Sequence, residues 1–364
     1  MAPKCPWSLV LAPMAYQKVT KGRMLMLGKT KGFLPLVSTT MTKPATGQGF
    51  DRRAIPAAAS ESVWHAKDGH EIRYIDWPAP PANVPYRGSM LFMAGRGDAY
   101  EKYIESFEHW RLRGWQVSAA DWRGQGGSGR LGLDDSTGHI DDFALWITDL
   151  ADFWRKWAEG REGPLALMGH SMGGHLTLRA VMEKVLTPVP DALVLSAPML
   201  DVFPEAVPLP IKLGLARLMT KLGDPRRPAW KMSERPGVKA GLRGDLLTHD
   251  KARYQDEIWW RKHRPELRLG PGSWGWVKGA MESSATLFRR GAMEGVDMPV
   301  YIVATNADRL VSPSAIRSAI ARLPRVESLL FGKEARHEIL REEDSIRNRA
   351  LAGIDEFLER TLTR

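Results

Sequence analysis

The sequence predicts an α/β protein in which a mostly parallel, doubly wound sheet carries an inserted helical cap. Short apolar runs that end in glycine, aspartate or small residues alternate with amphipathic helical segments, a pattern typical of strands joined by crossover helices. About a hundred residues then separate two of these runs without a further strand pattern. A Gly-x-Ser-x-Gly pentapeptide also follows one run directly and precedes a helical segment.

The first predicted element is an antiparallel hairpin. Segments 61–66 and 70–77 flank an Asp-Gly pair, which is a strong hairpin turn signal. Six buried strands are expected after it, at 89–95, 115–121, 164–170, 192–198, 299–305 and 326–331. Helices are expected between most of these strands. They are clearest at 99–113 and 140–158, where apolar residues recur at spacings of three and four.

These elements divide the chain into four expected parts. Residues 60–198 and 281–364 form the two parts of the core, and 199–280 form the helical cap inserted between them. Residues 1–59 hold nine lysines and arginines but one acid, so we expect a basic, flexible leader there. An alternative is that translation starts later, at Met41, and that this leader is not made.

Composition excludes several classes of protein. Hydrophobic residues make up 43% of the chain and charged residues 26%, which excludes wholesale disorder. The single cysteine, Cys5, excludes an intramolecular disulfide and a cysteine-rich metal site. The uncharged stretch 5–17 contains two prolines and is shorter than a membrane-spanning helix requires. We therefore expect a cytoplasmic protein. No metal or organic cofactor is predicted.

The net charge of +10 invites a nucleic-acid interpretation. The charge is unevenly placed, however, because the leader carries about +8 and the cap, with 16 basic and 9 acidic side chains, about +7. The rest of the chain is therefore acidic. The leader has few aromatic residues for base stacking, so no nucleic-acid partner is expected. A hydrolase fold that only binds a ligand is a second non-enzymatic alternative, which an intact set of catalytic residues disfavours.

The pentapeptide Gly169-His170-Ser171-Met172-Gly173 is the strongest signal. A strand that turns abruptly into a helix exposes the serine hydroxyl, and glycines at both flanks prevent side-chain collisions. The N-terminus of the following helix then favours a developing negative charge near Ser171. The alternative is that this glycine-rich turn matches the motif by chance. The strand pattern before it and the helical pattern after it argue against that alternative.

A serine nucleophile needs a base and an orienting carboxylate. In this arrangement the acid follows a late strand and the histidine comes later still. Asp308 follows the strand at 299–305, and His337 is the only histidine after it. Glu334 and Glu338 are alternative acids, but both lie beside the histidine on its own loop.

An oxyanion hole needs two backbone N–H donors. One is expected from Met172, the residue after the nucleophile, and the other from Arg96 in the loop Ala94-Gly95-Arg96-Gly97-Asp98. The Arg96 side chain could instead only anchor this loop through a salt bridge. The loop lacks the third glycine and the later acid of a dinucleotide-binding fingerprint, so no such cofactor site is expected.

Residues 60 to 360 resemble the α/β-hydrolase group that contains bacterial lysophospholipases and monoacylglycerol lipases. The matching segments are FMAGRGDAYEKY, DWRGQGGSGR, GHIDDF, GHSMGG, NADRLVS and ARHEIL, and in the cap LLTHDKARYQDE and PELRLGPGSWGWV. The resemblance implies a serine hydrolase that cleaves one fatty acyl ester of a monoacyl lipid. It assigns the nucleophile to Ser171, the acid to Asp308, the base to His337, and the oxyanion hole to Arg96 and Met172. Arg96 departs from the small residue of the lipase-type loop, and the leader has no counterpart.

The cap is expected to build the acyl pocket. Trp274 and Trp276 lie on a glycine-flanked segment suited to line it, whereas Trp259 and Trp260 are expected to hold cap helices together. The basic cap surface, including residues 261–264, is expected to meet anionic lipid headgroups at the inner face of the membrane. No protein partner is predicted. The alternative activity is that of a general carboxylesterase acting on small esters.

Overall fold

The computed structural model describes residues 50–201, 205–230 and 241–362. Most of the expected leader, residues 1–49, lies outside this part of the chain. Residues 50–59 belong to the folded unit, which begins at Phe50. The backbone carbonyl of Arg52 accepts a hydrogen bond from Trp260 Nε1 at 2.9 Å, and its guanidinium pairs with Asp256 at 2.6 Å. The expected end of the leader at residue 59 was therefore about ten residues too late.

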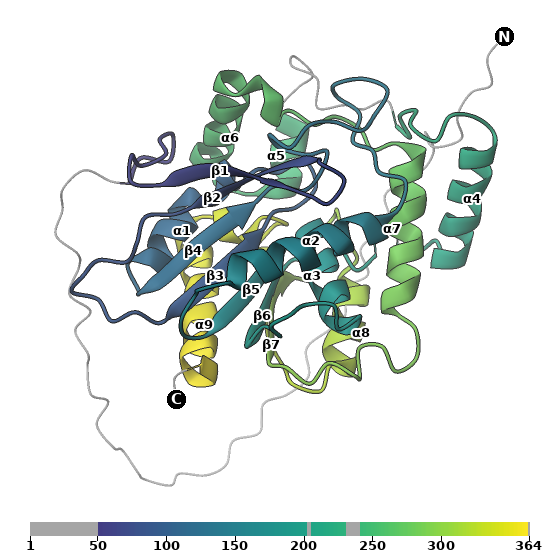
Figure 1. Cartoon of the computed structure of the whole chain (residues 1–364). Coiled ribbons are helices and arrows are strands. Elements are labelled where there is room, and N and C mark those ends of the chain that lie inside the picture. The colour runs from purple at the N-terminus through teal and green to yellow at the C-terminus, as the bar shows by residue number, and fades with distance from the viewer. Residues whose placement is uncertain (1–49, 202–204, 231–240, 363–364) are drawn as a thin grey trace, which may run out of the picture. The chain divides into compact units, whose positions relative to one another are not determined.

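The eight-stranded sheet has the order β1-β2-β4-β3-β5-β6-β7-β8 (Figure 1). The strands are β1 (Ser60–His65), β2 (Glu71–Asp76), β3 (Gly88–Met93), β4 (Trp115–Ala120), β5 (Leu165–His170), β6 (Ala192–Ser196), β7 (Val300–Thr305) and β8 (Val326–Phe331). β1 pairs with β2, and β2 with β4, in antiparallel fashion, and all later pairings are parallel. The predicted hairpin and six strands are thus confirmed, with ends that agree within two residues.

Helices connect the parallel strands, and a last helix follows β8. They are α1 (Ile104–Arg111), α2 (Phe143–Ala158), α3 (Met172–Met182), α4 (Leu209–Lys221), α5 (Gly241–Leu247), α6 (Lys251–His263), α7 (Trp274–Leu287), α8 (Pro313–Arg322) and α9 (Asp344–Leu362). Short 3-10 turns stand at η2 (Tyr100–Tyr103), η3 (Pro265–Leu267) and η4 (Ile339–Arg341). The second predicted helix begins at Phe143 rather than residue 140 because the Asp142 side chain caps it, accepting from the Ala144 N–H.

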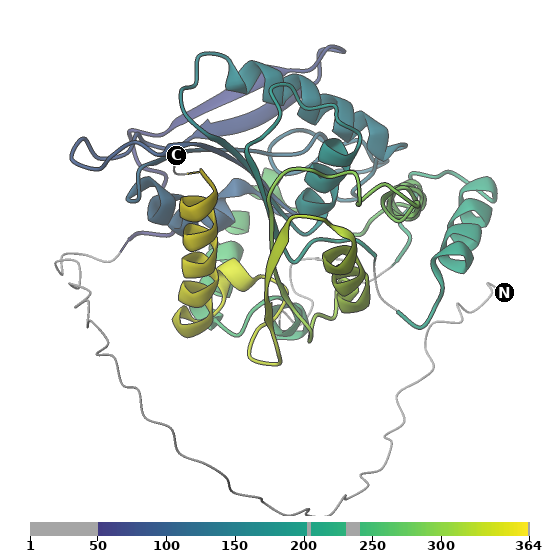
Figure 2. The ribbon, with the colours of Figure 1, turned by 90° about the horizontal axis from the view of Figure 1, so that it is seen from below.

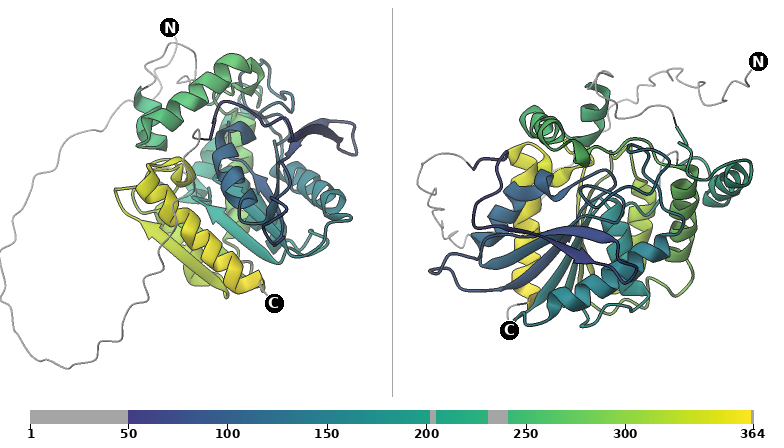
Figure 3. Two further views of the ribbon diagram at one scale, coloured as in Figure 1. Left: turned by 90° about the vertical axis from the view of Figure 1, so that its left-hand side faces the viewer. Right: turned by 45° about the horizontal axis from the view of Figure 1, so that its top comes forward.

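Alternate side chains of each central strand enter two separate cores, because successive residues of a strand point to opposite faces. Met90 and Phe92 of β3 pack with apolar residues of α1 and α9. Leu91 and Met93 of the same strand pack with α2, α3 and α8. Figure 3 shows α1 and α9 together on one face of the sheet. This two-sided burial explains why these strands appear in the sequence as continuous apolar runs.

The described residues between β6 and β7 form helices, as expected, with loops between them. The helices are α4, α5, α6 and α7, but α7 continues past residue 280 to Leu287 and contributes Met281 to the core. The expected cap boundary at residue 280 therefore falls inside a helix. α4 packs against α7 and lies farther from the sheet than α7 does (Figures 1 and 2). Within the described ranges, the helices are too short or too polar to cross a membrane.

Candidate active site

Ser171 occupies a strained turn between β5 and α3. Its backbone angles are φ 52° and ψ −117°, a conformation that non-glycine residues rarely adopt. A Cβ atom on Gly173 would lie 2.3 Å from the Met93 carbonyl oxygen, and one on Gly169 would lie 2.6 Å from the Gly173 backbone. Only glycine fits at these two positions, which explains the flanks of the pentapeptide.

The structure brings Ser171, His337 and Asp308 into one chain of contacts. His337 Nε2 lies 2.9 Å from Ser171 Oγ, and His337 Nδ1 lies 2.7 Å from Asp308 Oδ2. Because a carboxylate only accepts hydrogen bonds, Nδ1 carries the proton and Nε2 is free to accept from the serine hydroxyl. The other oxygen, Asp308 Oδ1, accepts from the backbone N–H groups of Leu310 at 2.8 Å and Val311 at 3.1 Å.

The surroundings favour a charged aspartate and a basic histidine. Burial opposes the charged form of each group, but the Asp308 charge and its hydrogen bond outweigh it and raise the pKa of His337. Burial is likewise outweighed at Asp308, whose pKa is lowered by the charge and hydrogen bond of His337 and by the two backbone donors. All three side chains are largely buried, and Ser171 is 9% exposed.

Neither alternative acid contacts the imidazole in the way Asp308 does. Glu338 points to Lys102, with which it pairs at 2.6 Å, and Glu334 lies on the exposed surface. Ser312, rather than Asp308, caps α8 by accepting from the Ala315 N–H. Asp308 is therefore the carboxylate that contacts the His337 imidazole.

The predicted oxyanion loop lies directly against the serine. A Cβ on Gly95 would come within 3.0 Å of Ser171 Cβ, and the Gly97 N–H donates to Gln125 Oε1 at 2.8 Å. Met172 is the first residue of α3, where a backbone N–H has no acceptor within its own helix. Gln125 was not predicted, because its contact joins two loops 28 residues apart.

The Arg96 side chain anchors its loop to the cap through a hydrogen bond and two aromatic contacts. Its Nη2 donates to the Gly270 carbonyl at 2.7 Å, and its guanidinium lies 5.3 Å from the Trp230 ring and 5.0 Å from the Trp276 ring. These are cation–π distances. The cap therefore holds the loop whose backbone is the candidate oxyanion donor.

The two tryptophans predicted to contact substrate have different surroundings. Trp276 is 6% exposed and packs in the core, with its ring 6.0 Å from Phe143. Trp274 is partly exposed at the first turn of α7. Trp260 is buried, its ring lies 5.0 Å from that of Trp259 on the same helix, and its Nε1 donates to the Arg52 carbonyl.

His170 is a further site residue that pattern analysis missed. Its ring lies 5.0 Å from the His337 ring, and it is 1% exposed. Burial and the neighbouring His337 lower the pKa of His170 to about 4, so it is neutral near pH 7. The pentapeptide allows any residue at this position, so no local signal marks it. Among the described residues, no cluster of three or more histidine, cysteine, aspartate or glutamate side chains is suited to hold a metal ion.

The nucleophile candidate is a serine on a strained strand-to-helix turn. It contacts a histidine, which in turn contacts an aspartate, and all three lie at the carboxyl ends of parallel strands. This arrangement defines the protein as an α/β-hydrolase. The chain belongs to the family described as serine aminopeptidase, S33, whose sequence profile matches residues 85–344.

Curated relatives extend this similarity over most of the chain. Lysophospholipase L2 of Escherichia coli is 27% identical over 313 residues, which cover 82% of this chain and 89% of that protein. Probable lysophospholipase L2 of Haemophilus influenzae is 26% identical over 275 residues, 75% of this chain and 84% of that one. A solved structure of a soluble variant of monoglyceride lipase from Saccharomyces cerevisiae shares the fold. Its TM-score is 0.67 at 22% identity, and the match covers 88% of this chain and all of that one. The chain is thus an ester hydrolase that resembles the lysophospholipases and monoacylglycerol lipases, as the sequence predicted.

Proposed function

We propose that this protein hydrolyses the single fatty acyl ester of a lysophospholipid or a monoacylglycerol, with Ser171 as nucleophile, His337 as general base and Asp308 as the orienting acid. The observation that carries this proposal is the 2.9 Å contact between Ser171 Oγ and His337 Nε2, continued by the 2.7 Å contact between His337 Nδ1 and Asp308. Nucleophile, base and orienter stand in the order that acyl transfer requires.

The proposed reaction has two halves. His337 accepts the hydroxyl proton as Ser171 attacks the acyl carbonyl, and the resulting oxyanion accepts hydrogen bonds from the Arg96 and Met172 amides. Each such donor contributes about 3 kcal/mol to transition-state stabilisation. The protonated His337 then gives its proton to the departing glycerol oxygen, which leaves an acyl-enzyme. Water, deprotonated by His337, attacks this ester and releases the fatty acid and the free serine.

The names of the relatives support a monoacyl lipid as substrate. The matches to both lysophospholipases cover three quarters or more of the chain, too long a span to be confined to the sequence around the nucleophile. Trp274, partly exposed on α7, is our candidate for contact with the acyl chain. Trp276 is more suited to support the Arg96 loop, because it is buried and lies 5.0 Å from the Arg96 guanidinium.

We also propose that α4 provides the peripheral contact with a membrane surface. The helix and its C-terminal cap residue carry four large apolar side chains at helical spacing, each between 37% and 69% exposed: Ile211, Leu215, Leu218 and Leu222. The basic segment 261–264 is less suited to this role than its sequence indicates. Arg261 pairs with Glu257, and Arg264 pairs with Glu61, so part of its charge is already neutralised.

Vesicle co-sedimentation tests this contact. Burying one leucine side chain contributes roughly 1.5–3 kcal/mol, so Leu218→Ser is expected to weaken binding to anionic vesicles about tenfold. Val189→Ser is the matched control, because Val189 is 70% exposed outside the cap, and it is expected to bind as the wild type does. Equal binding by both variants would argue against α4 as the contact.

A substrate panel tests the activity itself. Purified protein is assayed with lysophosphatidylethanolamine, a monoacylglycerol, a short p-nitrophenyl ester and an aminoacyl p-nitroanilide, and Ser171→Ala serves as the inactive control. We expect the long-chain monoacyl lipids to be preferred. Preference for the short ester would favour a general carboxylesterase, and cleavage of the anilide alone would favour a peptidase. Full activity of Ser171→Ala would overturn the assigned nucleophile.

A further inference from the structure

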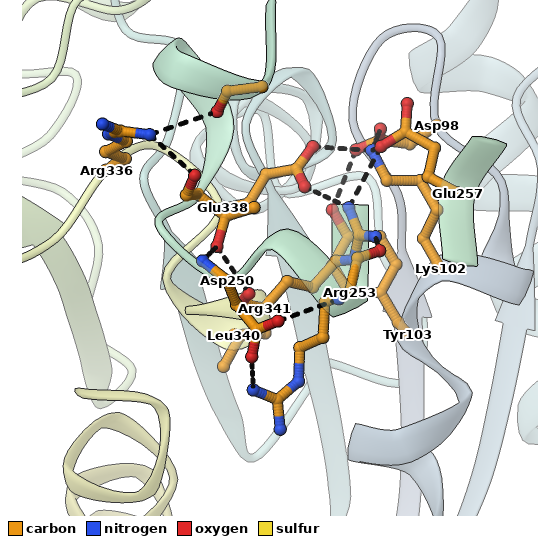
Figure 4. Close-up of polar contacts among 12 residues, drawn as sticks. Asp98, Lys102, Tyr103, Asp250, Arg253, Glu257, Arg336, Glu338, Leu340 and Arg341 are labelled. Carbon is orange, nitrogen blue, oxygen red and sulfur yellow. Dashed lines mark hydrogen bonds and ion pairs between the residues drawn. The ribbon is translucent and has the colours of Figure 1, made fainter. Parts of the chain in front are cut away.

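A cluster of buried charges joins the loop of His337 to the oxyanion loop and to the cap (Figure 4). We call it the Lys102 cluster and define it by Asp98, Lys102, Glu257, Glu338 and Arg341. The ammonium of Lys102 lies 2.5 Å from Asp98 Oδ1, 3.0 Å from Glu257 Oε2 and 2.6 Å from Glu338 Oε1. Its side chain is 4% exposed. One cation therefore contacts carboxylates from three separate parts of the chain.

Arg341 closes the cluster from the opposite side. Its guanidinium pairs with Glu338 and, at 3.1 Å, with Glu257, and it also donates to the Arg253 backbone carbonyl on α6. Glu338 thus lies between two cations, and it is the residue directly after His337 in the chain. Any shift of its carboxylate would be transmitted to the histidine through one peptide unit.

The backbone of the His337 loop is tied to the cap as well. The Glu338 N–H donates to the Leu247 carbonyl at the end of α5, at 2.8 Å. The Thr248 hydroxyl donates to the Arg341 carbonyl at 2.7 Å. The Arg336 N–H donates to Glu342, which also accepts from the His249 N–H. The cap segment around α5 and α6 is therefore part of the support of the base, whereas α4 packs mainly on α7.

At its other end, the Lys102 cluster reaches the oxyanion loop. Asp98 follows Arg96 by two residues, and its N–H donates to the Gly95 carbonyl at 3.3 Å. Its second oxygen accepts from the Tyr103 hydroxyl at 2.9 Å and lies 3.8 Å from His170 Nε2. A single lysine thus spans the loop of the candidate oxyanion donor and the loop of the base.

Stability alone does not account for such a cluster. Burying charges costs several kcal/mol each, and buried ion pairs replaced by well-packed apolar residues are often neutral or stabilising. What a fully paired network supplies is a defined position for the groups it joins. We propose that Lys102 is a positioning residue, which acts through Glu338 and Asp98 to hold His337 and the oxyanion loop in register with Ser171. This inference rests on the proposed function.

The cluster also sets the charge around the imidazole. The groups that face His337 are Asp308, Glu338, Asp98 and the neutral His170, and the three carboxylates all raise its pKa. Lys102 neutralises part of the charge of Glu338 and Asp98, both of which it contacts. Its removal is therefore expected to raise the pKa of His337 further, whereas removal of the Glu338 charge is expected to lower it.

The test compares Lys102→Met and Glu338→Gln with Asp149→Asn in the full chain. Asp149 forms an equally buried ion pair with Arg123, at 2.7 Å and with side chains 8% and 5% exposed, and it takes no part in the site. Circular dichroism and thermal unfolding establish the folded fraction of each variant. Hydrolysis of a p-nitrophenyl ester then gives kcat, KM and the pH dependence of kcat/KM per folded molecule.

We expect kcat to fall at least tenfold in Lys102→Met, with KM within threefold of the wild type and kcat unchanged in Asp149→Asn. The acid limb of kcat/KM should move to higher pH in Lys102→Met and to lower pH in Glu338→Gln. A Lys102→Met kcat within twofold of the wild type, an equal loss in Asp149→Asn, or limbs that move in the same direction would each overturn the inference. If Ser171→Ala stays active, the proposed function fails; if it is inactive while Lys102→Met is fully active, the positioning role alone fails.

Discussion

Replacing Asp308 by asparagine is the change that most sharply probes the proposed chemistry. Asp308 Oδ1 accepts two backbone N–H groups, from Leu310 and Val311. In the variant the amide oxygen must take that place, because an NH2 group there would face two donors. The amide nitrogen is then directed at His337 Nδ1, which must accept rather than donate.

This exchange forces the wrong histidine tautomer. With Nδ1 as an acceptor, the ring proton moves to Nε2, and Nε2 faces the Ser171 hydroxyl at 2.9 Å without a free lone pair. The base can no longer take the serine proton. The same substitution in a serine protease triad costs about 10⁴ in kcat, which corresponds to about 5.5 kcal/mol of transition-state stabilisation. We expect a loss of this size here.

The assay is the steady-state hydrolysis of a p-nitrophenyl ester, with thermal unfolding measured on the same preparations. The Asp308→Asn variant should remain folded and retain KM within a few-fold of the wild type, because the carboxylate is not expected to contact substrate. A folded variant whose kcat stays within tenfold of the wild type would refute the tautomer argument and the role of Asp308.

Three further predictions concern the same site. The acid limb of kcat/KM should have its midpoint above 6.5, because Asp308 raises the pKa of His337 above that ordinary value and only the unprotonated base is active; a pH-rate profile with a midpoint below 6.5 would contradict this. Gly173→Ala should unfold more easily in denaturant, since its Cβ would lie 2.3 Å from a backbone oxygen. In the control Gly214→Ala, in α4, the new Cβ meets nothing within 4 Å, and the free energy of unfolding should rise by about 0.5–1 kcal/mol. Equal stabilities of the two variants would be incompatible with the strand-to-helix packing. Arg96→Ala should lower kcat about tenfold or more by releasing the oxyanion loop from the cap, and an unchanged kcat would show that the loop is held in other ways.

Much of the fold was predictable because its signals are local. The central strands are buried on both faces, so each appears in the sequence as an uninterrupted apolar run with a turn residue at its end. The order of the site along the chain was predictable for a similar reason, since His337 is the only histidine after Asp308. The structure places these two side chains 2.7 Å apart, although they are separated by a helix and a strand.

Pairings between distant segments could not be predicted in this way. The basic residue Arg264 suggested part of a charged surface, but it pairs with Glu61 on β1, 203 positions earlier in the chain. Residues 50–59 share the basic composition of the predicted leader, but they pack against α6, where Arg52 forms an ion pair with Asp256. The composition gives the number of charged residues, but the fold determines which of them form ion pairs.

The predicted site was incomplete because some of its contacts also join distant segments of the chain. No pattern around Lys102 indicates that its ammonium would lie 2.6 Å from the residue after the base, because the two positions are 236 residues apart. Trp276 shows the converse. The glycines beside Trp276 led us to expect that it lines the acyl pocket. In the structure, its ring instead packs in the core against Phe143.

Covalent trapping of Ser171 tests the central claim most directly. The protein is treated with an alkyl fluorophosphonate, digested with trypsin and analysed by mass spectrometry alongside the remaining hydrolytic activity on a monoacyl lipid. Ser171 is the only serine in the tryptic peptide 162–179. We predict one adduct per chain on that peptide, formed in proportion to the loss of activity. Complete loss of activity with the adduct elsewhere, or full labelling of this peptide with activity retained, would contradict the proposed mechanism.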